Sequence, residues 1–134
     1  MAKQQEVIVV TGAAAGVGRA VAREFAQPGR AIALLARDTQ GLENARREVE
    51  ERGAKGLAIP LDIADAEAVE AAAERIEQEL GPIDIWVNDA MTTVFSRFVE
   101  MTAKEFRRAT EVTYLGTVYG TMAALKRMYP RNAG

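Results

Sequence analysis

The sequence predicts an α/β protein built on a parallel β-sheet. Two observations lead to this prediction. Short segments that are apolar throughout alternate with longer segments that have helical periodicity. A glycine-rich turn joins the first apolar segment to the first helical one. Strands that are buried on both faces are apolar along their whole length, and their alternation with helices is typical of a parallel sheet covered on both sides.

Four strands are expected, at residues 6–11, 30–36, 55–61 and 83–88. Pro60 lies near the end of the third segment, which is typical of a strand end or an edge strand because proline cannot donate to the sheet. Right-handed crossovers then predict a Rossmann-type three-layer sandwich with the strand order 3-2-1-4. The fourth strand would lie at an edge of the sheet.

The first of four expected helices covers residues 17–27. Val17, Val21 and Phe25 would share one apolar face. Pro28 and the glycine after it predict the end of this helix.

The second and third helices have recognisable first residues. Thr39 is expected to cap the second helix, which would run to Arg52, and Asp65 is expected to cap a third helix over residues 66–80. Both side chains can accept a hydrogen bond from an unpaired backbone N–H group of the first turn.

The last expected helix is long and covers residues 103–129. Thr102 and Glu105 have the spacing of a capping box at its start. Gly116 and Gly120 each weaken the helix interior by about 1 kcal/mol relative to alanine. These glycines predict a close neighbour on that face, or a bend.

Composition narrows the classes of function. The 134 residues suffice for one domain, residues 1–134, and the net charge of −2 comes without a basic stripe, so no nucleic-acid partner is expected. No apolar run approaches the roughly 18 residues of a membrane span, so no membrane partner is expected. The chain has no cysteine and no histidine, so neither a thiol nucleophile nor a metal site is expected. The N-terminus has no pattern of a signal peptide, which predicts a cytoplasmic protein.

The glycine turn has the spacing G-x-x-x-G-x-G, formed by Gly12, Gly16 and Gly18. Without Cβ atoms such a turn lets phosphate groups approach the backbone, and the start of the next helix attracts anions. A tight turn without a ligand remains an alternative. The position after the first strand, where strand order reverses, favours a dinucleotide site.

Three motifs together resemble the short-chain dehydrogenase/reductase family. They are "TGAAAGVG" at residues 11–18, "LDI" at residues 61–63 and "NDAM" at residues 88–91. The resemblance covers all 134 residues, which correspond to about the first half of a family member. It implies an NAD(P)-dependent oxidoreductase of alcohol or carbonyl groups, truncated before the fifth strand.

The resemblance implies cofactor-binding roles along the strand ends. Thr11 would hold the turn, and Asp62 would accept a hydrogen bond from the amino group of adenine. The other positions implied to line the cofactor are Gly12, Gly16, Val17, Gly18, Ile63, Asn88, Ala90 and Val112.

The residue after the second strand bears on the type of cofactor. An acidic side chain there would bind the ribose 2′-hydroxyl of NAD(H), but this chain has Arg37. A guanidinium group suits a phosphate, so NADP(H) is favoured and NAD(H) stays possible. The alternative is a solvated charge at the start of a loop. The alanines at residues 13–15 offer no second cation for a 2′-phosphate.

Three positions depart from the family pattern. Asp89 and Met91 replace an asparagine and a glycine, and Thr113 stands where members have the asparagine of the proton relay. The floor of the pocket and the hydrogen bonds near it are therefore expected to differ.

No catalytic residue is expected in this chain. Family chemistry needs a serine and a Tyr-x-x-x-Lys pair, and neither Tyr114, Tyr119 nor Tyr129 is followed by a lysine four residues on. We interpret the three tyrosines as helix packing, and we give Ser96 no catalytic role because it lies ahead of the catalytic region.

Two functions remain open from the sequence. The first is the NADP(H)-binding portion of a short-chain oxidoreductase that is catalytically inactive as this chain. The alternative is a non-catalytic nucleotide-binding module or sensor. A homo-oligomer is expected through the helix at 103–129, whose face at Gly116 and Gly120 is small, or through the exposed edge of the fourth strand.

Overall fold

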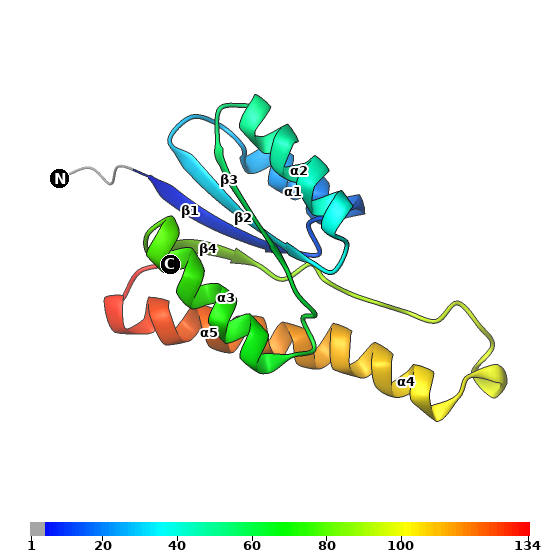
Figure 1. The fold of residues 1–134 in the computed structure, drawn as a ribbon. Coiled ribbons are helices and arrows are strands. Elements are labelled where there is room, and N and C mark those ends of the chain that lie inside the picture. Colours follow the sequence, from blue (N-terminus) through cyan, green and yellow to red (C-terminus); the bar gives the residue numbers. More distant parts are fainter. Residues whose placement is uncertain (1–4) are drawn as a thin grey trace.

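A computed structural model describes residues 5–134 and contains a four-stranded parallel sheet (Figure 1). The strand order is β3-β2-β1-β4, which confirms the predicted Rossmann-type topology. Pro60 is the last residue of β3, at an edge of the sheet, as its missing N–H group requires. The strands are β1 (Glu6–Thr11), β2 (Arg30–Ala36), β3 (Lys55–Pro60) and β4 (Ile83–Val87).

One face of the sheet is covered by α1 (Gly16–Phe25) and α2 (Thr39–Glu51). Alternate residues of β1, Ile8 and Val10, are fully buried in the core on this side. Leu42 and Val49 of α2 lie in the same cluster.

The other face is covered by α3 (Ala66–Glu79) and α5 (Gly116–Arg131). Val7 and Val9 of β1 belong to this second core, together with Ile76 of α3. Because β1 contributes to both cores, it lies at the centre of the fold, and its carboxyl end is a fixed platform.

The region of the last helix differs from the prediction. It consists of α4 (Ala103–Thr110), a π-helical turn, η2 (Glu111–Leu115), and α5. The helical segment predicted over 103–129 is continuous from Ala103 to Arg131, but η2 inserts a wider turn that the prediction did not contain. Pro130 lies inside the last turn of α5, and the helix ends at Asn132, which adopts a left-handed conformation with φ of 48°.

The two glycines of this region have close neighbours within the chain. A Cβ atom on Gly116 would lie 2.8 Å from a side-chain carbon of Ile63, and one on Gly120 would lie 2.8 Å from Nε1 of Trp86. The prediction of a close neighbour is confirmed. The same observation removes the glycine face as a reason for self-association, because β4 and the loop after β3 already cover it.

Two local predictions in the first half of the chain are wrong. Asp38, rather than Thr39, caps α2, and its carboxylate accepts a hydrogen bond from the Gly41 N–H group at 3.0 Å. The aspartate stands three residues before that N–H group, which is the distance a capping side chain spans. Val17 is 69% exposed instead of sharing the buried face of α1, since it lies in the first turn, beyond the edge of the core. The caps Asp65 and Thr102 are confirmed.

The tyrosines of the C-terminal region divide into two groups. Tyr119 packs against the core, as predicted. Tyr114 and Tyr129 are 66% and 84% exposed, so helix packing is the wrong interpretation for them. No helix among residues 5–134 is long and apolar enough to cross a lipid bilayer.

Candidate functional site

A groove of about 300 Å³ lies at the carboxyl ends of the strands. It opens where β1 and β4 meet, beside the turn that leads into α1, which is the usual ligand position in this topology. Its walls come from the end of β2, the segments after β1, β3 and β4, α4 and the π-helical turn η2. The lining residues are Gly12, Ala14, Ala15, Leu35, Ala36, Arg37, Asp38, Leu61, Asp62, Ile63, Ala90, Met91, Thr92, Arg108 and Val112.

Thr11 joins the glycine turn to the segment that follows β4. Its hydroxyl accepts hydrogen bonds from the backbone N–H groups of Asp89 and Ala90, both at 3.0 Å, and donates to the Val87 carbonyl at 3.4 Å. Thr11 is only 1% exposed, so these bonds are shielded from water. The two segments that flank the groove are therefore fixed relative to each other.

Gly12 is required because the glycine turn passes close to the backbone of the segment after β4. It has a φ of +66°, and a Cβ atom there would lie 2.9 Å from Cα of Ala90. Gly18 is similarly enclosed, because its Cβ would lie 2.8 Å from the carbonyl carbon of Gly12 and 2.7 Å from the Oδ2 atom of Asp89. Both glycines allow backbone to pack on backbone.

Gly16 has a different environment. Its φ is +56°, but a Cβ atom there would meet no heavy atom within 4 Å. Its neighbours Ala15 and Val17 are also exposed, so the backbone at the start of α1 faces open space beside the groove.

The N-terminus of α1 has no side-chain cap, since Ala15 stands at the capping position. The starts of α2, α3 and α4 are each capped by a side chain, from Asp38, Asp65 and Thr102. The first N–H groups of a helix need a partner, and an anion satisfies both these groups and the helix dipole. The start of α1 is thus suited to a phosphate group.

Arg37 lines the other end of the groove, after β2. Its side chain is exposed, and it forms no hydrogen bond or ion pair with the rest of residues 5–134. Most other arginines are engaged; Arg19, for example, forms an ion pair with Glu48. The adjacent carboxylate, Asp38, caps α2, and its Oδ1 accepts from the Gly41 N–H group.

Asp62 lies between Arg37 and α4. Its carboxylate forms a bidentate ion pair with Arg108, with Nη2–Oδ1 and Nη1–Oδ2 distances of 3.1 and 2.9 Å, and Oδ1 also accepts from the Ala64 N–H group at 3.0 Å. The hydrogen bonds from Arg108 lower the pKa of Asp62 below its usual value, and the Ala64 N–H group and the charge of Arg37 act in the same direction. Asp62 is therefore a charged acceptor at neutral pH.

The structure brings most of the residues implied by the resemblance to one place. Asn88 is an exception, because its Oδ1 accepts from Trp86 Nε1 at 2.9 Å and its Nδ2 donates to Thr121 at 3.1 Å. Its side chain is directed to α5 and does not line the groove. Thr11, Gly16, Val17 and Gly18 lie in or beside the turn at the mouth of the groove. The predicted residues that line the groove itself are Gly12, Arg37, Asp62, Ile63, Ala90 and Val112.

Sequence reasoning missed Arg108, Asp38 and Thr92. Two adjacent arginines, Arg107 and Arg108, stand in α4, and only the orientation of that helix decides which one reaches Asp62. The capping role of Asp38 could have been predicted from the sequence, because aspartate caps a helix at least as well as the neighbouring threonine.

Thr113, at one of the departures from the family pattern, holds the wall of the groove. Its hydroxyl accepts from the Thr92 N–H group at 3.1 Å and donates to the Thr92 carbonyl at 2.9 Å. It lies in η2, so the π-helical turn and the segment after β4 are joined.

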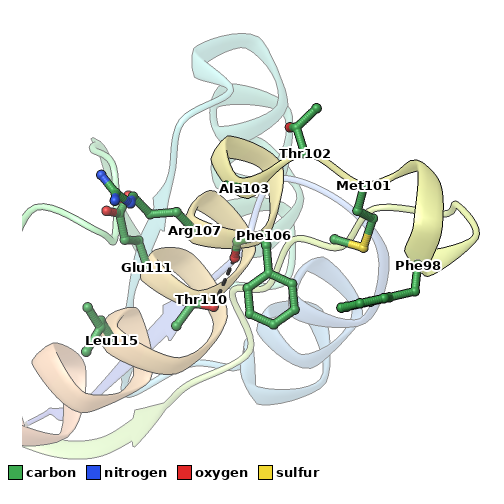
Figure 2. Close-up of a pocket in the computed structure, with 9 residues that line it drawn as sticks. All are labelled: Phe98, Met101, Thr102, Ala103, Phe106, Arg107, Thr110, Glu111 and Leu115. Atoms are coloured by element: carbon green, nitrogen blue, oxygen red, sulfur yellow. Dashed lines mark hydrogen bonds between the residues drawn. The ribbon is translucent and has the colours of Figure 1, made fainter.

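A larger hollow of about 800 Å³ lies on another side of α4 (Figure 2). Phe98 and Phe106 face each other across it, with ring centroids 6.3 Å apart in an edge-to-face arrangement. Met101 and Leu115 continue its apolar wall. It shares no lining residue with the groove, and although Arg107 lines it, it has no uncapped helix start or glycine turn among its lining residues to match those of the groove.

Comparison with known proteins agrees with these features. The family model described as "short chain dehydrogenase" matches residues 6–134. The chain belongs to this family. A 3-dehydrosphinganine reductase of Danio rerio is 37% identical to it over 132 residues, which are 95% of this chain and 40% of the relative.

Solved structures of the family superpose closely. An alcohol dehydrogenase from Thermococcus sibiricus complexed with 5-hydroxy-NADP has a TM-score of 0.88 at 33% identity, covering 96% of this chain and 55% of its own. An NAD+-bound xylitol dehydrogenase has a TM-score of 0.91 at 29% identity, covering 99% and 52%. The chain thus spans about half the length of these solved structures and less than half of the curated relative.

Proposed function

We propose that this chain binds NADP(H) in the groove at the strand ends, as the cofactor-binding portion of a short-chain oxidoreductase. The observation that carries this proposal is one groove lined by the turn before an uncapped helix start and by Arg37, which is exposed and has no ion-pair partner among residues 5–134. Both features suit phosphate groups. The structural relatives that bind 5-hydroxy-NADP and NAD+ support a nicotinamide dinucleotide.

The glycine turn would hold the pyrophosphate. The start of α1 offers backbone N–H groups without a side-chain partner, and the space above Gly16 is open. Val17, although exposed, would present its N–H group in the first turn rather than its side chain.

Arg37 favours NADP(H) over NAD(H). NADP(H) differs by a 2′-phosphate, which a guanidinium group binds through charge-assisted hydrogen bonds. A carboxylate directly after β2 would favour NAD(H) by binding the ribose 2′-hydroxyl, but this chain has Arg37 there, and the following Asp38 is held at the start of α2 by its capping bond to Gly41. Structural relatives bind either type, so this preference rests on the residues of this chain.

Calorimetric titration of the purified chain with NADPH and NADH tests the proposal. We expect saturable one-to-one binding with micromolar affinity for NADPH and weaker binding of NADH. Arg37→Gln should lower the affinity for NADPH by about tenfold, the loss of one charge-assisted hydrogen bond, and leave NADH nearly unchanged. Arg47→Gln is the matched control, because Arg47 is an exposed arginine of α2 outside the groove. Equal losses in the two variants, or no binding by the unaltered chain, would contradict the proposal.

We further infer that residues 1–134 alone do not transfer hydride. The tyrosines lack a lysine four residues on, and Ser96 hydrogen-bonds the carbonyl of the adjacent Arg97 in an exposed loop. A purified chain assayed for NADPH oxidation with simple ketones should show no turnover above buffer. Steady turnover would overturn this inference, and binding without turnover also suits the alternative of a nucleotide-binding module.

Self-association, a single domain over residues 1–134 and a cytoplasmic location remain predictions. The edge of β4 and exposed apolar side chains of α5, among them Met122 and Leu125, support self-association. Light scattering coupled to size exclusion should give a mass above 14.5 kDa, and a monomer at high concentration would contradict it.

A further inference from the structure

Within the part of the chain that the structure describes, helix α4 has a single polar link to the strand ends. None of its residues is buried, and its other hydrogen bonds stay within the helix and its capping residue. Among residues 5–134, the ion pair from Arg108 to Asp62 is the one hydrogen-bonded connection of α4 to the loop after β3. Both residues of the pair line the groove.

The pair constrains both oxygens of the carboxylate. Arg108 contacts Oδ1 and Oδ2 through two nitrogens, and the Ala64 N–H group occupies a further site on Oδ1. A carboxylate has about four acceptor positions, so roughly one remains for a ligand, in a fixed direction. The planar fork of a guanidinium group sets this orientation, which a lysine would not.

The link is accessible rather than buried. The side chains of Arg108 and Asp62 are 36% and 38% exposed, and they stand at the wall of the groove. A ligand in the groove can therefore meet the free acceptor position without breaking the pair. Arg37 is the other charged group that acts on this carboxylate.

We propose that Arg108 is a positioning residue, which holds the Asp62 carboxylate so that it recognises the amino group of the adenine ring. This inference rests on the proposed function. Without Arg108 the carboxylate can rotate, and the chain loses discrimination between a 6-amino group, which donates a hydrogen bond, and a 6-carbonyl oxygen, which accepts one. Arg108 itself need not touch the ligand.

The probe pair is NADPH and its deaminated analogue, in which a carbonyl oxygen replaces the amino group. The unaltered chain should bind NADPH about tenfold or more tightly than the analogue, because a carboxylate repels that oxygen. Arg108→Gln should reduce this ratio to about two or less, mainly by weakening NADPH. Arg107→Gln, on the same helix but outside the groove, should keep the ratio.

A double-variant cycle separates positioning from general structure. Asp62→Asn should abolish the discrimination, and adding Arg108→Gln to it should cause no further change in the ratio. Arg108→Lys keeps the charge without the fork, so its ratio should fall between those of Arg108→Gln and the unaltered chain. If Arg108→Gln does not fold, as judged by circular dichroism, the ratio measured for Arg108→Lys tests the proposal in its place.

The outcomes are distinguishable. A chain that binds neither dinucleotide overturns the proposed function and this inference with it. A chain that binds both and discriminates, but keeps its ratio in Arg108→Gln or Arg108→Lys, overturns the role of Arg108 alone. Equal weakening of both dinucleotides would also overturn it, because a structural loss does not select between them.

Discussion

Gly12→Ala and Gly16→Ala form a matched pair that tests how the glycine turn is built. Both glycines have a left-handed backbone, with φ of +66° and +56°, and both lie in the turn before α1. For an L-residue this conformation costs about 1–2 kcal/mol. The two sites differ in the space around the new methyl group.

At Gly12 the methyl group would lie 2.9 Å from Cα and 3.0 Å from the nitrogen of Ala90. These are backbone atoms held by the Thr11 hydroxyl, so they cannot swing away, and overpacking of this kind costs about 1–3 kcal/mol. At Gly16 nothing lies within 4 Å. We therefore expect Gly12→Ala to lower the free energy of unfolding by about 2–5 kcal/mol and Gly16→Ala by about 1–2 kcal/mol.

Urea unfolding followed by circular dichroism measures both values on the same chain. Alanine in place of glycine lowers the conformational entropy of the unfolded chain, and this offsets the loss of stability by a similar amount in both variants. The difference in stability between the two variants therefore isolates the contact with Ala90. Equal losses of stability, or a larger loss for Gly16→Ala, would refute the reasoning that Gly12 is required by the segment after β4.

Two further predictions concern charges. Hydrogen bonds from Arg19 lower the pKa of Glu48 below its ordinary 4.5, so the ion pair stabilises the fold above pH 4.5, and this stabilisation is lost as the pH falls through the lower pKa of the folded state. In urea unfolding at a series of pH values below 4.5, Glu48→Gln should therefore lose less stability with falling pH than the unaltered chain. An equal loss in the two proteins would contradict this prediction. Asp89→Asn removes a negative charge whose Oδ2 lies beside Gly18 at the start of α1. This change should tighten NADPH binding by up to about fivefold, since two charges 4 Å apart in water interact by about 1 kcal/mol. Unchanged or weaker binding in calorimetry would show that this carboxylate does not oppose the phosphates.

Much of the fold follows from local patterns. The strands are apolar throughout, and Asp65 and Thr102 stand where capping requires, so these elements could be placed from the sequence. The π-helical turn at Glu111–Leu115 could not, because the segment EVTYL has no local pattern that distinguishes a wider turn from an ordinary helical one.

In the candidate site, too, some residues could be predicted from local sequence patterns and others only from the tertiary structure. The glycine turn and Arg37 could be predicted because each directly follows a strand, and Asp62 because the motif around it resembles that of the family. The partner of Asp62 was not, because a helix displays several arginines and only tertiary structure selects Arg108. Asn88 follows β4 as well, but the side chain turns to α5, since its amide is satisfied by Trp86 and Thr121.

The central claim, that NADP(H) occupies the groove at the strand ends, is tested most directly by hydrogen exchange of the chain with and without NADPH. The account predicts slower exchange of the backbone amides at residues 12–18, 37–38, 62–64 and 90–92, which surround the groove. Protection confined to residues 98–115, around the apolar hollow beside α4, or no protection in the glycine turn, would contradict it.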